Sequence, residues 1–446
     1  MMTLSTFWKH LSLTTIMALL APALVGATTY PAAVARTGQA TCYDTNGLII
    51  DCSGTGQDGD WLAGVPWPTP RFTDNGDGTV TDGLTGLVWA KNANLMITRD
   101  PSFDADGTAG DGMVTWQHAL EYVAKLNSEN YLGYTDWSLP NVNELESLAN
   151  LEVFDPALPA GHPFTNVRSN YYWLSMSLAN SPIHAWIVDM SCGYVSYVAK
   201  TGSCCVWPVR SGQCGALGAS VICLPKTGQT SCFNTAGDSI TCTDTGQDGE
   251  LQNGVAWPSP RFEEDNGTVT DNLTGLVWAK DANLMASRDP SFDADGLAED
   301  GAVTWQHALD YVAKLNSENH LGQSDWRLPN ERELRSLADY SKTYPALPAG
   351  HPFTNVQVGS YWSSPSIAGN PLNAFVASVS NGLVSNISKS FKNFVWPVRS
   401  GQVGDSGIST TTTTAGSTTT APVTTTAPVT TTTTQPTTTT TAATGP

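Results

Sequence analysis

The chain repeats itself, and this repeat limits the possible folds more than any other feature. The segment WPTPRFTDNGDGTVTDGLTGLVWAKNANLM at 67–96 returns as WPSPRFEEDNGTVTDNLTGLVWAKDANLM at 257–285, and PALPAGHPFTNV recurs unchanged. The offset is 189 to 190 residues, whereas solenoids and propellers repeat every ~20–50 residues. The sequence therefore predicts two copies of one whole domain rather than a repeat array.

Both ends of the chain differ in composition from the repeated part. Lys9 and His10 precede an apolar run at 11–20, and small residues follow at 25–27, which is the layout of a cleaved signal peptide. The alternative, a membrane anchor, is less favoured because a span needs roughly 20 apolar residues. From Ser409 onward the chain is almost wholly Thr, Pro, Ala and Gly, which cannot form a core.

These observations give the expected organisation. We expect a signal peptide at 1–27, copy 1 at 37–213, a linker at 214–225, copy 2 at 226–402 and a disordered Thr/Pro-rich tail at 403–446. The tail is interpreted as an O-glycosylated stalk or as a plain linker. The mature protein is expected to be secreted or held at the cell surface, with no membrane span after signal cleavage.

The net charge of −19 disfavours several classes of partner. Without a local basic cluster, such a chain repels nucleic acid, anionic lipid and sulfated polysaccharide. It favours neutral or cationic ligands and attracts divalent cations.

Each copy shows strand, helix and strand patterns in that order. In TCYDTNGLIIDC, the Asn46-Gly47 pair predicts a two-residue hairpin turn. TWQHALEYVAKL predicts a helix with one apolar stripe and His118 toward water. Asn141 and Glu144 predict a capped second helix, and branched and aromatic residues in the last third predict strands. The fold class is therefore α+β, with two helices packed on a mostly antiparallel sheet in each copy.

The nine cysteines fit an oxidising compartment. We expect disulfides Cys42–Cys52 and Cys232–Cys242 around the two hairpins. A further disulfide is expected from Cys192 to Cys204 or Cys205 across neighbouring strands, and Cys214 with Cys223 would clip the linker. One cysteine, Cys204 or Cys205, would remain to bridge to another chain.

Several motifs together carry a family resemblance. In copy 2 they are NGTVTDNLTGLVWAKDAN, TWQHALDYVAKLN, DWRLPNERELRSL, YWSS and VWPVR, with looser versions in copy 1. They resemble the C-terminal domain family of the Legionella collagen-like adhesin (Lcl). The resemblance implies extracellular attachment, often to polysaccharide. A more distant likeness to the C-type-lectin-like fold of formylglycine-generating enzymes implies two tandem lectin-like domains whose long loops hold ligand.

The acidic stretches SFDADGTAGDG (102–112) and SFDADGLAEDG (291–301) have two interpretations. They are not EF-hands, because Thr115 stands where the twelfth-position glutamate is needed. Calcium accepts loose sets of oxygens, so the stretches form part of a calcium site or are simply turns before a helix. The residues concerned are Asp104, Asp106, Asp111, Asp293, Asp295 and Asp300. No other cofactor is expected.

Aromatic residues and variable loops are the candidate ligand contacts. Tyr172, Trp173, Tyr361 and Trp362 could lie flat against a sugar ring, or they could be core residues. The loops near Asn180 and Asn370 differ between the copies, and differing loops on a shared frame set specificity.

No arrangement of catalytic residues is recognisable. The sequence lacks a Ser-His-Asp order, a phosphate loop and an HEXXH motif, so we name no catalytic residue and expect no enzyme. The leading hypothesis is an exported, non-catalytic binding protein whose partner is a surface glycan or an extracellular protein. The alternatives are a structural subunit of an extracellular layer or filament and, third, an enzyme on a formylglycine-generating-enzyme-like fold.

Overall fold

The computed structural model describes residues 30–104, 110–212, 221–293 and 300–400. The predicted signal peptide, the Thr-rich tail, Asp106, Asp295 and Cys214 lie outside these ranges. In the described ranges, we find no helix with the length and apolar character needed to cross a membrane.

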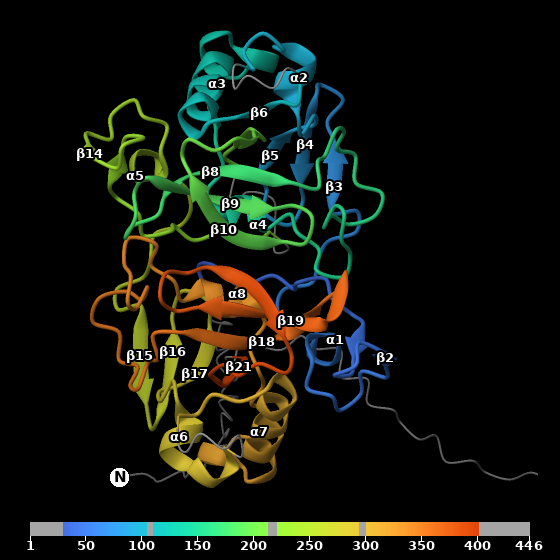
Figure 1. Cartoon of the computed structure of the whole chain (residues 1–446), viewed down its shortest axis with the longest axis vertical. Helices are drawn as coiled ribbons and strands as arrows, with labels where there is room; N and C mark the ends of the chain where they lie inside the picture. The colour runs from blue at the N-terminus through green and yellow to red at the C-terminus, as the bar shows by residue number, and fades with distance from the viewer. Residues whose placement is uncertain (1–29, 105–109, 213–220, 294–299, 401–446) are drawn as a thin grey trace, which may run out of the picture. The chain divides into compact units, whose positions relative to one another are not determined.

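The elements of copy 1 follow one another as predicted, with strands before and after the helices (Figure 1). They are β1 (Cys42–Tyr43), β2 (Ile49–Ile50), α1 (Asp58–Trp61), β3 (Phe72–Asp74), β4 (Thr79–Asp82), β5 (Val88–Ala90), α2 (Leu95–Arg99), β6 (Met113–Val114), α3 (Trp116–Ser128), β7 (Trp137–Ser138), α4 (Val142–Glu146), β8 (Tyr171–Ser177), β9 (His184–Asp189), β10 (Tyr194–Ala199), β11 (Cys204–Cys205) and β12 (Val209–Arg210).

Copy 2 repeats this order. Its elements are β13 (Cys232–Phe233), β14 (Ser239–Ile240), α5 (Asp248–Leu251), β15 (Phe262–Asp265), β16 (Thr268–Asp271), β17 (Leu276–Ala279), α6 (Leu284–Arg288), α7 (Trp305–Ser317), α8 (Glu331–Ser336), β18 (Ser360–Ile367), β19 (Asn370–Ser378), β20 (Val384–Ser388) and β21 (Val398–Ser400).

Strands β1 and β2 and strands β13 and β14 form two hairpins, and three larger sheets hold the other strands. Together they confirm a mostly antiparallel α+β fold. Copy 1 has the sheet β3-β4-β5-β12-β7, and copy 2 has β15-β16-β17-β21. A third sheet, β18-β19-β20-β10-β9-β8-β11-β6, contains strands of both copies. Within it β11 pairs with β8 in parallel, and the other pairings are antiparallel.

The two main helices of each copy form where the sequence predicts them. The predicted apolar stripe of α3 is buried, and Tyr122 is buried with it. At α4 the backbone N–H of Glu144 donates to Asn141 Oδ1 (3.0 Å), and the Glu144 carboxylate accepts from the Asn141 N–H (2.8 Å). The prediction that His118 faces water holds only in part. Its side chain is 26% exposed, while its ring stacks on Phe103 with centroids 4.3 Å apart and its Nε2 contacts the Phe103 carbonyl.

Each N-terminal segment crosses to the other copy. The Gln39 side-chain amide donates to the Ser366 carbonyl (2.7 Å) and accepts from the Ser366 N–H (2.8 Å). The equivalent Gln229 makes the same pair of bonds with Ser177 (2.7 and 3.1 Å). Because these four residues are buried, the exchange is part of the core and not a surface contact.

Two buried lysines hold the exchanged hairpins. Lys389 Nζ donates to the carbonyls of Tyr43 (3.3 Å) and Asp44 (3.1 Å), and it lies 4.0 Å from the centroid of the Trp305 ring. Lys200 repeats this with the carbonyls of Phe233 and Asn234 and the Trp116 ring. Burial lowers the pKa of Lys389 to about 8 and that of Lys200 to about 7.

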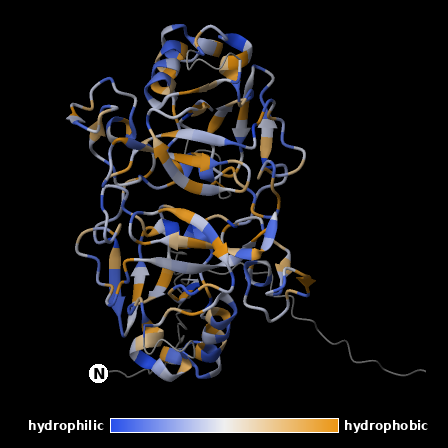
Figure 2. Ribbon diagram, viewed as in Figure 1, coloured by the Kyte–Doolittle hydropathy of each residue, from blue (hydrophilic) through white to orange (hydrophobic). Residues whose placement is uncertain are grey.

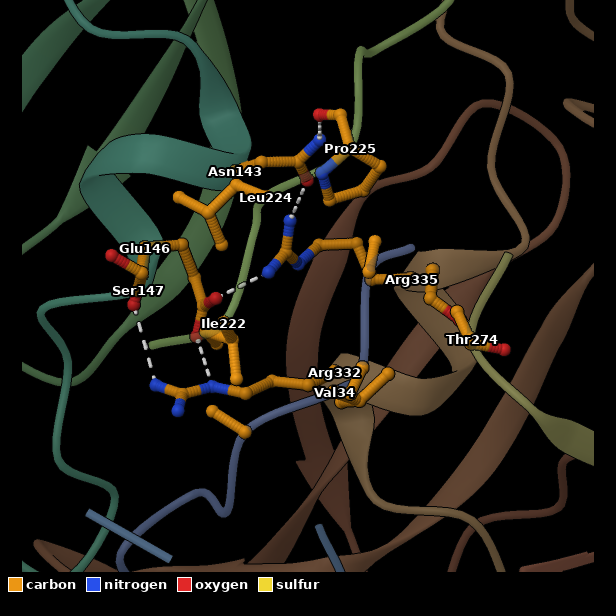
Figure 3. A pocket seen from close by; sticks show the side chains of 14 residues that line it. Val34, Asn143, Glu146, Ser147, Ile222, Leu224, Pro225, Thr274, Arg332 and Arg335 are labelled. Carbon is orange, nitrogen blue, oxygen red and sulfur yellow. Dashed lines mark hydrogen bonds and ion pairs between the residues drawn. The ribbon is translucent and has the colours of Figure 1, made fainter. Parts of the chain in front are cut away.

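Helices α4 and α8 face each other where the copies meet, and Figure 3 shows the side chains that join them. Arg332 Nε donates to Glu146 (2.9 Å), and Arg335 donates to Asn143 (2.6 Å) and also pairs with Glu146. The cavity beside them is about 50 Å³, which has room for a few water molecules. It is too small for a sugar. We therefore infer that these side chains hold the two copies together and do not form a ligand site.

The hairpin disulfides Cys42–Cys52 and Cys232–Cys242 are formed as predicted. Cys223 is also disulfide-bonded. Cys192, Cys204 and Cys205 are free thiols, so the predicted pairing of Cys192 with one of the other two is wrong. Cys192 follows β9, and β8 lies between β9 and β11 in the sheet. Because neighbouring strands are ~4.8 Å apart, one intervening strand puts the sulfurs out of bonding reach.

Candidate functional site

The four aromatic residues predicted as ligand contacts lie in the core. Tyr172, Trp173, Tyr361 and Trp362 are each 0% exposed. The indole N–H of Trp173 donates to the Val114 carbonyl (2.6 Å), and that of Trp362 donates to the Val303 carbonyl (2.7 Å). A ring without exposed surface cannot receive a sugar, so the core-packing interpretation replaces the ligand-binding one at these positions.

Asn180 and Asn370 are exposed, as a role in ligand contact requires. Asn180 lies in the turn between β8 and β9, and its amide donates to the Tyr344 hydroxyl of copy 2 (3.4 Å). Asn370 begins β19. Their role in ligand contact stays a prediction.

The acidic stretches are arranged as turns in the part that the structure describes. Asp104 Oδ2 accepts from the Gly112 N–H and Asp111 Oδ1 from the Met113 N–H (both 2.9 Å), and Asp293 and Asp300 do the same in copy 2. Asp104 Oδ1 and Asn94 Oδ1 are buried and accept no hydrogen bond from the residues that the structure describes. Among the described residues, no three His, Cys, Asp or Glu side chains gather as metal ligands. Calcium binding at these stretches stays a prediction.

A groove lies where the exchanged hairpin of copy 1 meets helix α7 of copy 2. The hairpin is formed by β1 and β2, closed by Cys42–Cys52 and followed by α1. Its loop passes over α7 at Gly56, where a Cβ atom would lie 3.7 Å from Leu309 Cδ2. The groove has a volume of about 430 Å³, within the ~300–1,000 Å³ of small-molecule sites.

The groove combines an aromatic wall, an apolar floor and a polar rim. Trp61 is 40% exposed and is the only exposed tryptophan of the described residues. Ile50 lies on the same wall, and Leu309 lines the groove from α7. Asp60, Gln306 and Asp310 supply the polar groups.

The two carboxylates are held in place by hydrogen bonds to residues four positions earlier in the sequence. Gln306 donates to Asp310 Oδ1 (3.0 Å) along one face of α7, and the Gly56 N–H donates to Asp60 Oδ2 (3.0 Å). Each carboxylate thus has one oxygen engaged within the described residues and can accept further hydrogen bonds from a ligand through the other. The rim carries negative charge, and we find no cation among the side chains that line the groove in the described ranges.

The equivalent surface of the other copy lacks the aromatic ring. GQDGDWLAGV at 56–65 corresponds to GQDGELQNGV at 246–255, so Leu251 stands at the position of Trp61 and Glu250 at that of Asp60. Gly246 lies against Leu120 of α3 as Gly56 lies against Leu309. The two surfaces therefore share a frame, and an aromatic side chain at this position is present in only one of them.

The groove could not be predicted from the sequence as long as each hairpin was assigned to its own copy. The available signal was the change from Trp61 to Leu251 in otherwise similar segments. A tryptophan that only one of two repeated domains carries is not required by the fold. Figure 2 shows a related signal, since β2 is hydrophobic although both of its residues are exposed.

The comparisons with known proteins identify the domain. The family model described as "Lcl C-terminal domain" matches residues 78–210 and again 267–399. Neither the curated proteins nor the solved structures contain a match. The hairpin and the following helix α1, which ends at Trp61, precede the first matched range. Since the two matches cover more than half of the chain, the protein belongs to the Lcl C-terminal domain family and contains two copies of its domain.

Proposed function

We propose that the protein is an exported, non-catalytic binding protein that attaches to carbohydrate on a cell surface or in its surroundings. Membership of a family named for an adhesin domain supports attachment as the role. The hairpin disulfides support an oxidising, extracytoplasmic location. We also propose that the domains are lectin-like. The described sheets and helices establish the α+β class and no finer fold.

The observation that carries the proposal is the groove between the copy 1 hairpin and α7. It brings an exposed indole, an apolar floor and carboxylate and amide groups together around about 430 Å³. A pyranose has an apolar face that packs on an aromatic ring and hydroxyl groups that need fixed hydrogen-bond partners. Binding of this kind requires no group that makes or breaks covalent bonds.

A glycan array probed with the secreted full-length chain tests the proposal. Selective signals among neutral glycans are expected, with weaker signals from sulfated and uronic-acid glycans, which the acidic rim repels. The array is run with and without a chelator, because loss of signal on chelation would support calcium at the acidic stretches. Silence across all glycan classes in both conditions would contradict the proposal.

Burial of the free thiols disfavours the alternative, a structural subunit linked to other chains by disulfides. Cys204 and Cys205 are buried in β11, so a bridge from either to another chain requires this strand to open. Cys192 is partly buried, and burial raises its thiol pKa to about 11, which slows oxidation. Sizing under non-reducing conditions tests this alternative, and a disulfide-linked oligomer would support it.

A further inference from the structure

We propose that the groove between the copy 1 hairpin and α7 is a single-site receptor for a neutral pyranose, with the Trp61 indole as the stacking platform. This inference rests on the proposed function and adds its location, its ligand class and its number of sites per chain. The matched ranges of the family begin after the hairpin, so the site is a feature of this chain's composite architecture.

The exposure of Trp61 is unusual for a tryptophan in this fold. Ten other tryptophans are among the largest fully buried side chains, so the fold normally uses this residue type in its core. Trp61 is instead 40% exposed at the end of α1, at the edge of a hollow. Exposing an indole leaves apolar surface in contact with water, which costs free energy in proportion to the area exposed. A ligand that covers the ring would recover it.

The polar rim selects the ligand class. Asp60 and Asp310 can accept hydrogen bonds from sugar hydroxyls, and a carboxylate makes stronger hydrogen bonds than a neutral acceptor. The same two carboxylates repel sulfate and uronate groups at close range. The groove therefore fits uncharged hexopyranoses better than the sulfated polysaccharides that bind basic surfaces.

The internal repeat fixes the number of sites. Leu251 occupies the position of Trp61 against α3, and a branched aliphatic side chain offers no flat π-face to a sugar ring. One strong site per chain is therefore expected, although the domain is present twice. Leu251 also provides a matched control, since it is exposed to a similar extent in the equivalent helix.

The test uses calorimetric titration of the full-length chain with methyl glycosides of glucose, galactose, mannose and N-acetylglucosamine, and with the oligosaccharide that gives the strongest array signal. One site per chain is expected. Trp61→Ala should weaken binding at least about tenfold, as loss of a central aromatic contact does. Leu251→Ala should leave the affinity unchanged, and Trp61→Tyr should retain most of it because a ring remains.

The outcomes separate this inference from the proposed function. If the chain binds glycans on the array but Trp61→Ala binds them as tightly as the wild type, the groove assignment is wrong and the adhesive role stands. Two equal sites per chain would also overturn the inference. Thermal unfolding of each variant shows whether it is folded, and Trp61→Tyr keeps the test valid if Trp61→Ala unfolds.

Discussion

Val195 and Val384 lie opposite each other in the antiparallel pair β10–β20, and they are the same position of the repeated domain, 189 residues apart. Equivalent strands that pair antiparallel at equivalent residues are what a two-fold axis produces. The reciprocal bonds of Gln39 with Ser366 and of Gln229 with Ser177 obey the same relation. The two copies therefore pair as the subunits of an isologous dimer would, within one chain.

The hydrogen bonds of Gln39 and Gln229 across the two copies should contribute to the unfolding free energy. Gln39→Ala removes a side chain that satisfies both backbone groups of Ser366, which is buried. Because unsatisfied buried backbone groups cost ~1–3 kcal/mol each, we expect a loss of at least about 2 kcal/mol in unfolding free energy. Denaturant titration measures it. Gln117→Ala, on the exposed face of α3, should change stability by less than about 0.5 kcal/mol, and an equal effect of both variants would contradict the account.

The buried ion pairs across the two-fold axis should contribute more to the stability of the protein than exposed ion pairs do. Glu146 and Arg335 are equivalent positions that carry opposite charges and meet at the junction. Glu146→Gln removes the carboxylate that both buried guanidinium groups share and leaves Arg332 with the longer contact to Glu331 (3.5 Å). Breaking a buried ion pair in this way typically costs ~3–5 kcal/mol. Asp136→Asn, which breaks the exposed pair with Arg210, should cost less than ~1 kcal/mol. Thermal unfolding of the two variants compares them, and similar losses would argue against the junction's role.

Local sequence rules predicted local structure well. The apolar spacing of α3, the capping of α4 by Asn141 and Glu144, and the hairpin disulfides all depend on residues close in sequence. The exchange of hairpins could not be predicted this way. Gln39 and Ser366 are 327 residues apart, and a repeat does not say which copy a segment packs against.

The buried aromatic residues show a second limit of prediction from sequence. In β8, which runs from Tyr171 to Ser177, every residue after the first is buried, so the strand has core on both faces. Such a strand shows a continuous aromatic and apolar run instead of alternation. The pattern of Tyr172 and Trp173 is therefore the same for a core strand and for a sugar platform, and only the packed structure distinguishes them.

Buried carboxyl groups should make the protein more stable in mild acid than at neutral pH. Burial, together with the nearby Asp248 carboxylate, raises the pKa of Glu144 to about 8. Its stabilising contribution is complete below the unfolded pKa of about 4.5 and is lost as pH rises through about 8. The loss approaches ~1.4 kcal/mol per pH unit between these values.

In the Glu144→Gln variant the unfolding free energy should therefore decrease less steeply between pH 5 and 7, because the amide does not titrate. Glu263→Gln, at an exposed position of β15, should leave the wild-type slope unchanged. Denaturant titrations at intervals of about half a pH unit would show the difference. A Glu144→Gln slope equal to that of the wild type would contradict the assignment.

The two hairpin disulfides should differ in their effect on binding. Replacing Cys42 and Cys52 by serine loosens the wall that carries Trp61, whereas the same change at Cys232 and Cys242 affects the surface with Leu251. Each pair of substitutions should cost about 3 kcal/mol of stability, since both close short loops of equal length. Only the first should weaken glycan binding, as measured by titration. Equal weakening by both would indicate a general effect of unfolding.

A crystal structure of the full-length chain with the oligosaccharide that binds most strongly on the array tests the central claim most directly. We expect a pyranose ring stacked on Trp61 between the copy 1 hairpin and α7, with hydroxyl groups bonded to Asp60 or Asp310. A sugar seated elsewhere, for instance on the loops of Asn180 and Asn370, with an empty groove at Trp61 would contradict it.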